Sequence, residues 1–130
     1  MSVSLKVRDE TARGEVIAEA VLRFPAERIS VRELIETRVE QEIERYHAST
    51  SSSFNGLIQP TEAEQLLNGP RTNRLKLDAE KQKKTAIEAF GSNGFFLFLN
   101  DRQLTELDQS ILITPNSQVS FLRLIPLVGG

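Results

Sequence analysis

The chain of 130 residues contains no cysteine and only one histidine. The lack of cysteine excludes disulfide bonds, thiolate metal sites and a cysteine nucleophile within this chain, although it does not identify the compartment. No apolar run approaches the roughly 18 residues that a membrane-spanning helix needs. The net charge is −2, so the sequence lacks the basic excess that would indicate nucleic acid or an anionic membrane as partner.

Motifs for catalysis or cofactor binding are also missing. We find no glycine loop that would cradle a phosphate, no metal-ligand spacing and no catalytic triad. The single histidine, His47, ends a segment rich in acids, where a favourable charge at a helix C-terminus explains it better than catalysis. The residues therefore give no sign of an enzyme or of a metal or cofactor bound by the chain itself. Charges in the first ten residues replace the apolar stretch of a signal peptide, so we expect a cytoplasmic location.

The N-terminal third predicts a β-hairpin followed by a helix. Residues 3–7 alternate between apolar and polar, and every second residue of 16–24 is apolar, with Pro25 at the end. Ser30 and Glu33 then form a capping box, which predicts a helix over about 31–47. Its expected core face is Val31, Leu34, Ile35, Val39, Ile43 and Tyr46. Glu and Arg fill the other face, where residues 38 and 42 make an i,i+4 pair.

The middle of the chain, 49–93, predicts an insertion. Its serine-rich start has no periodicity and is expected to form a flexible loop. A short helix with a capping box at Thr61 and Glu64 follows. A second helix is predicted over about 78–90, with Asp78 as N-cap and Gly91 as the stop.

The last third is strand-rich. Residues 95–99 are continuously apolar, which is typical of a buried strand, and a turn follows at 100–104. A short strand at 111–114, a turn at Pro115 and a long strand ended by Pro126 complete the pattern. This order predicts one α+β domain, a mixed sheet with one crossing helix, with the first and last strands in its centre. The expected core is about 1–48 and 94–126, and the tail 127–130 should project freely.

The strand order and the final Gly129-Gly130 resemble the ubiquitin-like β-grasp family. The likeness is greatest to its sulphur-carrier branch, the small subunit of molybdopterin synthase and the thiamine sulphur carrier. Asn100-Asp101-Arg102 matches the turn of that branch, and Pro126-Leu127-Val128-Gly129-Gly130 matches its tail. The resemblance covers about 1–48 and 94–130, whereas 49–93 has no counterpart in the small sulphur carriers.

This resemblance implies that the carboxylate of Gly130 is the reactive group. A ubiquitin-activating-type enzyme would adenylate it with ATP and Mg²⁺, and an enzyme cysteine would take it as a thioester. Transfer to a target amine would leave an isopeptide bond, with a conjugating enzyme and a deconjugating protease as further partners. Gly129 has no Cβ, so the backbone can approach an enzyme channel closely, and Pro126, Leu127 and Val128 would dock there. Because nothing follows Gly130 in the sequence, we expect no processing protease.

Three functions stay open at this point: a bacterial-type protein modifier, a sulphur carrier with a C-terminal thiocarboxylate, and a non-covalent β-grasp interaction module. The size of the chain favours the modifier. If Val119 and Phe121 face the core, Leu122 and Leu124 face outward as a partner patch, unless the insertion covers them. Self-association is also open, because edge strands can pair with another copy. Chain formation through lysine is a further hypothesis for Lys6, Lys76, Lys81, Lys83 and Lys84.

Overall fold

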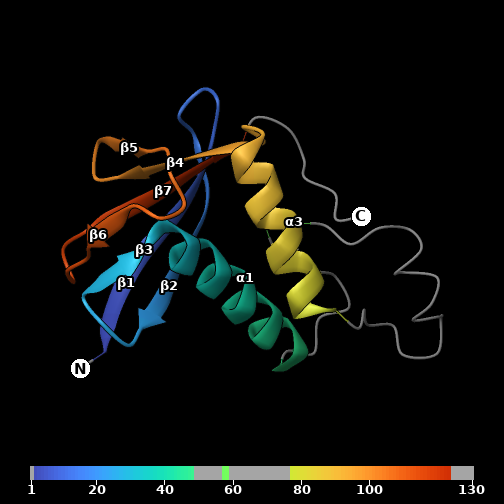
Figure 1. Cartoon of the computed structure of the whole chain (residues 1–130). Coiled ribbons are helices and arrows are strands. Elements are labelled where there is room, and N and C mark those ends of the chain that lie inside the picture. Colours follow the sequence, from blue (N-terminus) through green and yellow to red (C-terminus); the bar gives the residue numbers. More distant parts are fainter. Residues whose placement is uncertain (1, 49–56, 59–76, 124–130) are drawn as a thin grey trace.

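The structure is a computed structural model, and it describes residues 2–48, 57–58 and 77–123. Its principal feature is a five-stranded mixed sheet with two helices on one side (Figure 1). The strands lie in the order β2-β1-β7-β4-β5. Their bounds are Val3–Thr11 for β1, Val16–Phe24 for β2, Phe95–Leu99 for β4, Arg102–Leu104 for β5 and Gln118–Arg123 for β7. The predicted α+β class is confirmed.

The last strand lies in the middle of this sheet. β7 runs parallel to β1 on one side and antiparallel to β4 on the other. The N-terminal hairpin is confirmed, because β1 pairs antiparallel with β2 from Val3 opposite Phe24 onward. A bulge between Asp9 and Glu10 shifts the register, so that Ile17 has no partner on β1. The central placement of the first and last strands is therefore confirmed, with β1 next to β7.

The first helix, α1, spans Val31–Ala48 and begins as the capping box predicts. The backbone amide of Glu33 donates to the Ser30 hydroxyl at 3.1 Å, and the Glu33 carboxylate accepts from the Ser30 amide at 3.3 Å. A second, two-stranded sheet holds this end of the helix. It pairs β3 (Arg28–Ser30) with β6 (Ser110–Leu112). The amides of Val31 and Arg32 also donate to carbonyls of residues 109 and 107.

The second described helix, α3, spans Ala79–Gly91 and packs against α1 and β4. Asp78 is its N-cap and accepts from the Lys81 amide at 3.1 Å, as the sequence predicts. The helix ends at Gly91, but the left-handed residue that turns the chain is Asn93, with φ of 62°. The predicted loop at 49–56 and short helix near 61–69 lie outside the described residues.

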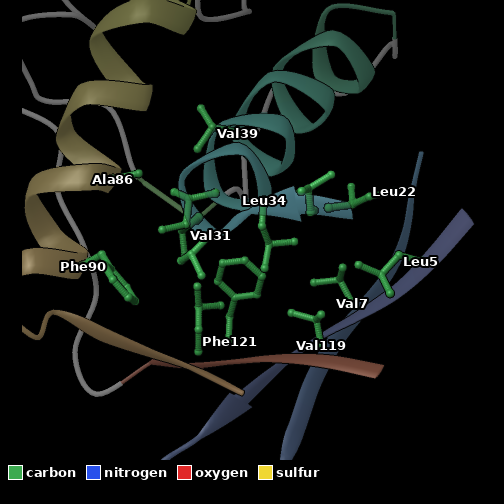
Figure 2. Packing of buried hydrophobic residues seen from close by; sticks show 14 of the residues in the cluster. Leu5, Val7, Leu22, Val31, Leu34, Val39, Ala86, Phe90, Val119 and Phe121 are labelled. Atoms are coloured by element: carbon green, nitrogen blue, oxygen red, sulfur yellow. The ribbon is translucent and has the colours of Figure 1, made fainter. Parts of the chain in front are cut away.

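The core lies between the sheet and the two helices (Figure 2). Side chains of β1 and β7, among them Val7 and Phe121, meet Leu34 from α1, and Phe90 of α3 closes one side. Leu57 and Ile58 are also fully buried, so parts of the expected insertion contribute to the same core. The fully buried large side chains are Phe24, Phe95, Phe121, Leu5, Leu22, Leu34, Ile35, Leu57, Ile58, Leu97, Leu104 and Ile113.

Three sequence expectations need correction. The stretch 100–104 contains a short strand, β5, as well as a turn, and β3 was not predicted. The strand at 95–99 is not buried on both faces, because Phe95 and Leu97 are buried whereas Phe96 and Phe98 are half-buried. In β2 only the C-terminal residues of the predicted inward row are buried, and Val16 is 44% exposed because the bulge turns the start of the strand outward.

Candidate functional site

The site that the sequence predicts is only partly within the described residues. Gly129, Gly130 and the docking segment Pro126, Leu127 and Val128 lie outside them, as does Leu124. Leu122, the other residue of the expected partner patch, lies on β7 and is half-buried. The candidate site is therefore the end of β7 and the surfaces around it.

The register of β7 is now fixed. Val119 and Phe121 are completely buried against α1, so Leu122 points to the opposite, outer face, as expected. There Leu122 lies opposite Phe96 of β4 and opposite Glu10 of β1. Phe98 lies on the same face one pair further along, opposite Ser120. Leu122, Phe96 and Phe98 therefore form an outer apolar strip of half-buried side chains beside the end of β7.

The inner face at the same end of the sheet contains a buried ion cluster. The carboxylate of Asp9, only 5% exposed, accepts from two guanidinium groups, those of Arg38 and Arg123. Arg38 donates to both Asp9 oxygens, with Nη2–Oδ2 at 2.7 Å, and Arg123 Nη2 donates to Oδ2 at 2.5 Å. Through these two ion pairs, Asp9 joins β1 to α1 and to the end of β7. The side chain of Arg123, the last described residue, is held in place by this contact.

Arg38 is held on several sides. It is 4% exposed, its guanidinium lies 4.3 Å from the centre of the Phe121 ring, and it donates to Glu42 one turn later at 3.2 Å. Desolvation by itself lowers the pKa of Arg38, but the charges of Glu42 and Asp9 outweigh it and raise the pKa above its usual value. Glu42 also accepts from the Leu57 amide at 3.1 Å, which ties the buried Leu57 to the cluster.

The charge of Arg123 is less well balanced by nearby carboxylates than that of Arg38. Desolvation lowers its pKa, the Asp9 carboxylate opposes that effect, and the nearby Arg38 cation adds to it. Its buried Nε has no hydrogen-bond partner among the described residues. Backbone pairing with β1 and β4 places Arg123 at the end of β7, and the contact with Asp9 holds its side chain on the inner face.

The chemistry open to this cluster is structural. Arginine does not release its proton in the physiological range. The oxygens of both carboxylates, Asp9 and Glu42, accept hydrogen bonds from within the protein, so the cluster presents no free acid or base to a substrate. The adjoining hollow between β2 and α1 measures about 140 Å³. Ligand pockets usually measure about 300–1,000 Å³, so the hollow is too small for a nucleotide. In the part of the chain that the structure describes, no group of acidic or histidine side chains could hold a metal ion.

Sequence reasoning missed this cluster. It placed Arg38 on the exposed face of the first helix, which is wrong, and it did not assign Asp9 to the first strand. The pair of Arg38 with Glu42 is confirmed, but it lies in a largely buried setting. A signal was present for both residues. Asp9 continues the inward alternation of β1, two residues after Val7. Arg38 follows the core residues Leu34 and Ile35 by four and three residues, which places it on the same face of the helix.

Neither α1 nor α3, the helices of the described ranges, has the length and apolar character that crossing a membrane requires. In comparisons with protein-family models, with curated proteins and with solved structures, nothing matches this chain. A functional assignment must therefore rest on the sequence and on the geometry described above.

Proposed function

We propose that this protein is a bacterial-type ubiquitin-like modifier with a β-grasp fold, activated at the carboxylate of Gly130. The observation that carries the proposal is the position of β7. This last strand lies in the centre of the sheet, and its end is fixed to β1 and α1 through Arg123 and Asp9. The seven residues after Arg123 thus start from a rigid point, and fully extended they would span at most about 25 Å.

The strand order supports the β-grasp assignment. An N-terminal hairpin leads into α1, and the last strand then inserts between β1 and β4, parallel to β1. In the β-grasp family this arrangement holds the chain end away from a compact body, which is what a partner enzyme needs in order to reach the terminal carboxylate. The proposal sets the reaction in the cytoplasm, where ATP is available.

The proposed chemistry has three steps, all catalysed by partner enzymes. A Gly130 carboxylate oxygen attacks the α-phosphorus of ATP, which forms an acyl-adenylate and releases pyrophosphate. An enzyme cysteine thiolate then attacks the acyl carbon and displaces AMP. Finally, a target amine displaces the thiolate and leaves an amide. ATP and Mg²⁺ belong to the activating enzyme in this scheme, and the protein itself acts as its substrate.

The body of the protein favours a modifier over a minimal sulphur carrier. α3 packs against α1 and contributes Ala86 and Phe90 to the core, and Leu57 and Ile58 add to it. The chain therefore forms a larger body than delivery of a sulphur atom requires. A sulphur carrier would share the adenylation step and then exchange one carboxylate oxygen for sulphur. The modifier ends as an amide and the carrier as a thiocarboxylate, so the mass of the product distinguishes the two functions.

We assign recognition by the activating enzyme to the outer apolar strip of Leu122, Phe96 and Phe98. These side chains are half-buried, lie on the neighbouring strands β4 and β7, and Leu122 directly precedes Arg123, the last residue of β7. Apolar side chains grouped on a polar surface are typical of a protein-binding surface. An enzyme that docks on this strip would have its nucleotide site within reach of the tail.

The test begins with the native protein. Its intact mass must show a chain that ends at Gly130, either as translated or after trimming. The purified protein is then mixed with an adenylating enzyme encoded beside it and with ATP, and ATP–pyrophosphate exchange is measured. Exchange should occur with the full chain and disappear on deletion of Gly130. Amide adducts to lysine support the modifier, whereas sulphur in place of oxygen in the intact mass indicates the carrier.

A matched pair of variants tests the recognition surface. Leu122→Ser should lower kcat/KM for exchange about fivefold or more, because buried interface leucines contribute on the order of 1–2 kcal/mol. Leu112→Ser, on β6 and 50% exposed, should leave the rate unchanged. The function is wrong if the native chain extends past Gly130 or supports no exchange. The strip assignment alone is wrong if both variants keep the full rate.

A further inference from the structure

β2 is a long edge strand whose outer side has no neighbouring strand among the described residues. It has nine residues and pairs only with β1 in the sheet that the structure describes, whereas β5 at the opposite edge has three. An unpaired edge presents a row of amide and carbonyl groups that another strand can bind. The nine residues of β2 provide enough length for such pairing.

One contact shows which backbone groups of β2 face this open side. The side-chain amide of Gln41, from α1, accepts from the Arg23 amide at 3.1 Å and donates to the Arg23 carbonyl at 2.7 Å. Both backbone groups of Arg23 therefore point away from β1. Because residues alternate in an antiparallel ladder, the backbone groups of Glu19 and Val21 point to the same open side. Within the described part of the chain, these backbone groups of Glu19 and Val21 have no hydrogen-bond partner.

The exposed face of β2 carries apolar side chains that lie between charged ones. Val21 is 53% exposed and Ile17 is 54% exposed, among the most exposed large apolar side chains of the described residues. Val21 lies between Glu19 and Arg23 in the outer row of β2, opposite Lys6 of β1. Along the strand, the row is therefore acidic, apolar and then basic. An antiparallel second copy presents the same row in the opposite order, so each acidic residue would face a basic one.

We propose that β2 pairs antiparallel with β2 of a second copy of this chain, in a register centred on Val21. This register places Val21 opposite the partner's Val21, and Glu19 and Arg23 opposite the partner's Arg23 and Glu19. Opposite charges directly across a ladder are favourable, and a two-fold axis supplies both pairs at once. A register centred on Glu19 would instead place two glutamates opposite each other, which is unfavourable. The inference does not depend on the function proposed above.

Gln41 competes with this dimer. In the proposed register the amide and carbonyl of Arg23 bond to the partner's Glu19, so the Gln41 side chain must leave them first. While Gln41 stays bonded to Arg23, the two Val21 residues can still form their hydrogen bonds across the interface. The two pairs of Glu19 with Arg23 cannot, because the backbone groups of Arg23 are occupied. The wild-type dimer should therefore be weak, and removing the Gln41 amide should strengthen it.

The experiment is sedimentation equilibrium of the full chain from micromolar to millimolar concentration. Glu19→Arg and Arg23→Glu should each raise the dimer dissociation constant about tenfold or more, because two attractive pairs become repulsive. The double charge swap should restore the wild-type value. Gln41→Ala should lower the constant about fivefold or more, since each protomer regains two free backbone groups.

Leu112→Lys is the control, because it removes an exposed apolar side chain from β6, away from this edge. It should leave the dissociation constant unchanged. Far-ultraviolet circular dichroism establishes that each variant is folded. The proposal is overturned if wild type and Gln41→Ala both stay monomeric at millimolar concentration. It is also overturned if the double swap fails to restore dimerisation, or if Leu112→Lys weakens the dimer as much as Glu19→Arg.

Discussion

Replacing Asp9 with asparagine should lower the free energy of unfolding by about 3 kcal/mol. The substitution keeps the shape of the side chain and removes the negative charge between Arg38 and Arg123. A pair of unit charges about 4 Å apart is worth about 4 kcal/mol at an effective dielectric constant of about 20. Removing one partner of a buried ion pair costs about 3–5 kcal/mol, because the other charge stays buried without compensation.

Two contacts reduce this loss to the lower end of that range. Glu42 still faces Arg38, at 3.2 Å, and continues to balance its charge. The amide oxygen of the new asparagine can still accept one hydrogen bond. Arg123 loses the most, because Asp9 is the carboxylate in direct contact with it and desolvation already lowers the pKa of Arg123.

The assay is urea unfolding followed by far-ultraviolet circular dichroism. The midpoint should fall while the slope m stays constant, since the variant exposes the same surface on unfolding. In a thermal scan, a loss of about 3 kcal/mol corresponds to a Tm lower by about 10 °C for a domain of this size.

Glu10→Gln is the matched control. Glu10 follows Asp9 on the same strand but points to the outer face, where it pairs with Arg8 at 3.7 Å on a partly exposed surface. Its loss should be within about 0.5 kcal/mol. If Asp9→Asn and Glu10→Gln destabilise the protein equally, the buried cluster does not stabilise the end of β7, and the reasoning above is wrong.

Two further predictions concern the helices. Ser30→Ala should lower the free energy of unfolding by about 1 kcal/mol, because the Glu33 amide loses its acceptor at the start of α1. Urea unfolding measures this loss, with Ser4→Ala at an exposed position as the control. Lys83 lies 2.8 Å from Glu40, and this hydrogen bond raises the pKa of Lys83 despite partial desolvation. The pair therefore stabilises the fold below the unfolded pKa of about 10.4, and the contribution is lost as the pH rises through the higher folded value. Glu40→Gln should cost less than about 1 kcal/mol at pH ~8, and this cost should shrink as the pH rises through the folded pKa of Lys83. A cost that does not change with pH would contradict this assignment.

Local features of the fold could be read from the sequence because they depend on neighbouring residues. The capping box at Ser30 and Glu33 and the N-cap at Asp78 satisfy backbone amides within one turn. The alternation in β1 also has a local cause, since successive side chains of a strand point to opposite faces. Short elements such as β3 and β5 have three residues each and too little pattern to be recognised.

The candidate site could be predicted only in part. The outward direction of Leu122 follows from alternation once Phe121 is placed in the core. The ion cluster could not be predicted in the same way, because Asp9, Arg38 and Arg123 lie far apart in the sequence. A charged residue is usually exposed, so the residue types themselves favour the wrong interpretation.

The sequence by itself determined the strand and helix periods, the helix starts and the α+β class, since these follow from hydrogen bonds and side-chain directions within a few residues. Tertiary structure alone decided that β7 enters between β1 and β4 and that Asp9 joins two arginines from distant segments. It also decided that Gln41 occupies one position on the open edge of β2. These contacts depend on which surfaces meet when the apolar faces are buried, and that choice is made by the whole chain at once.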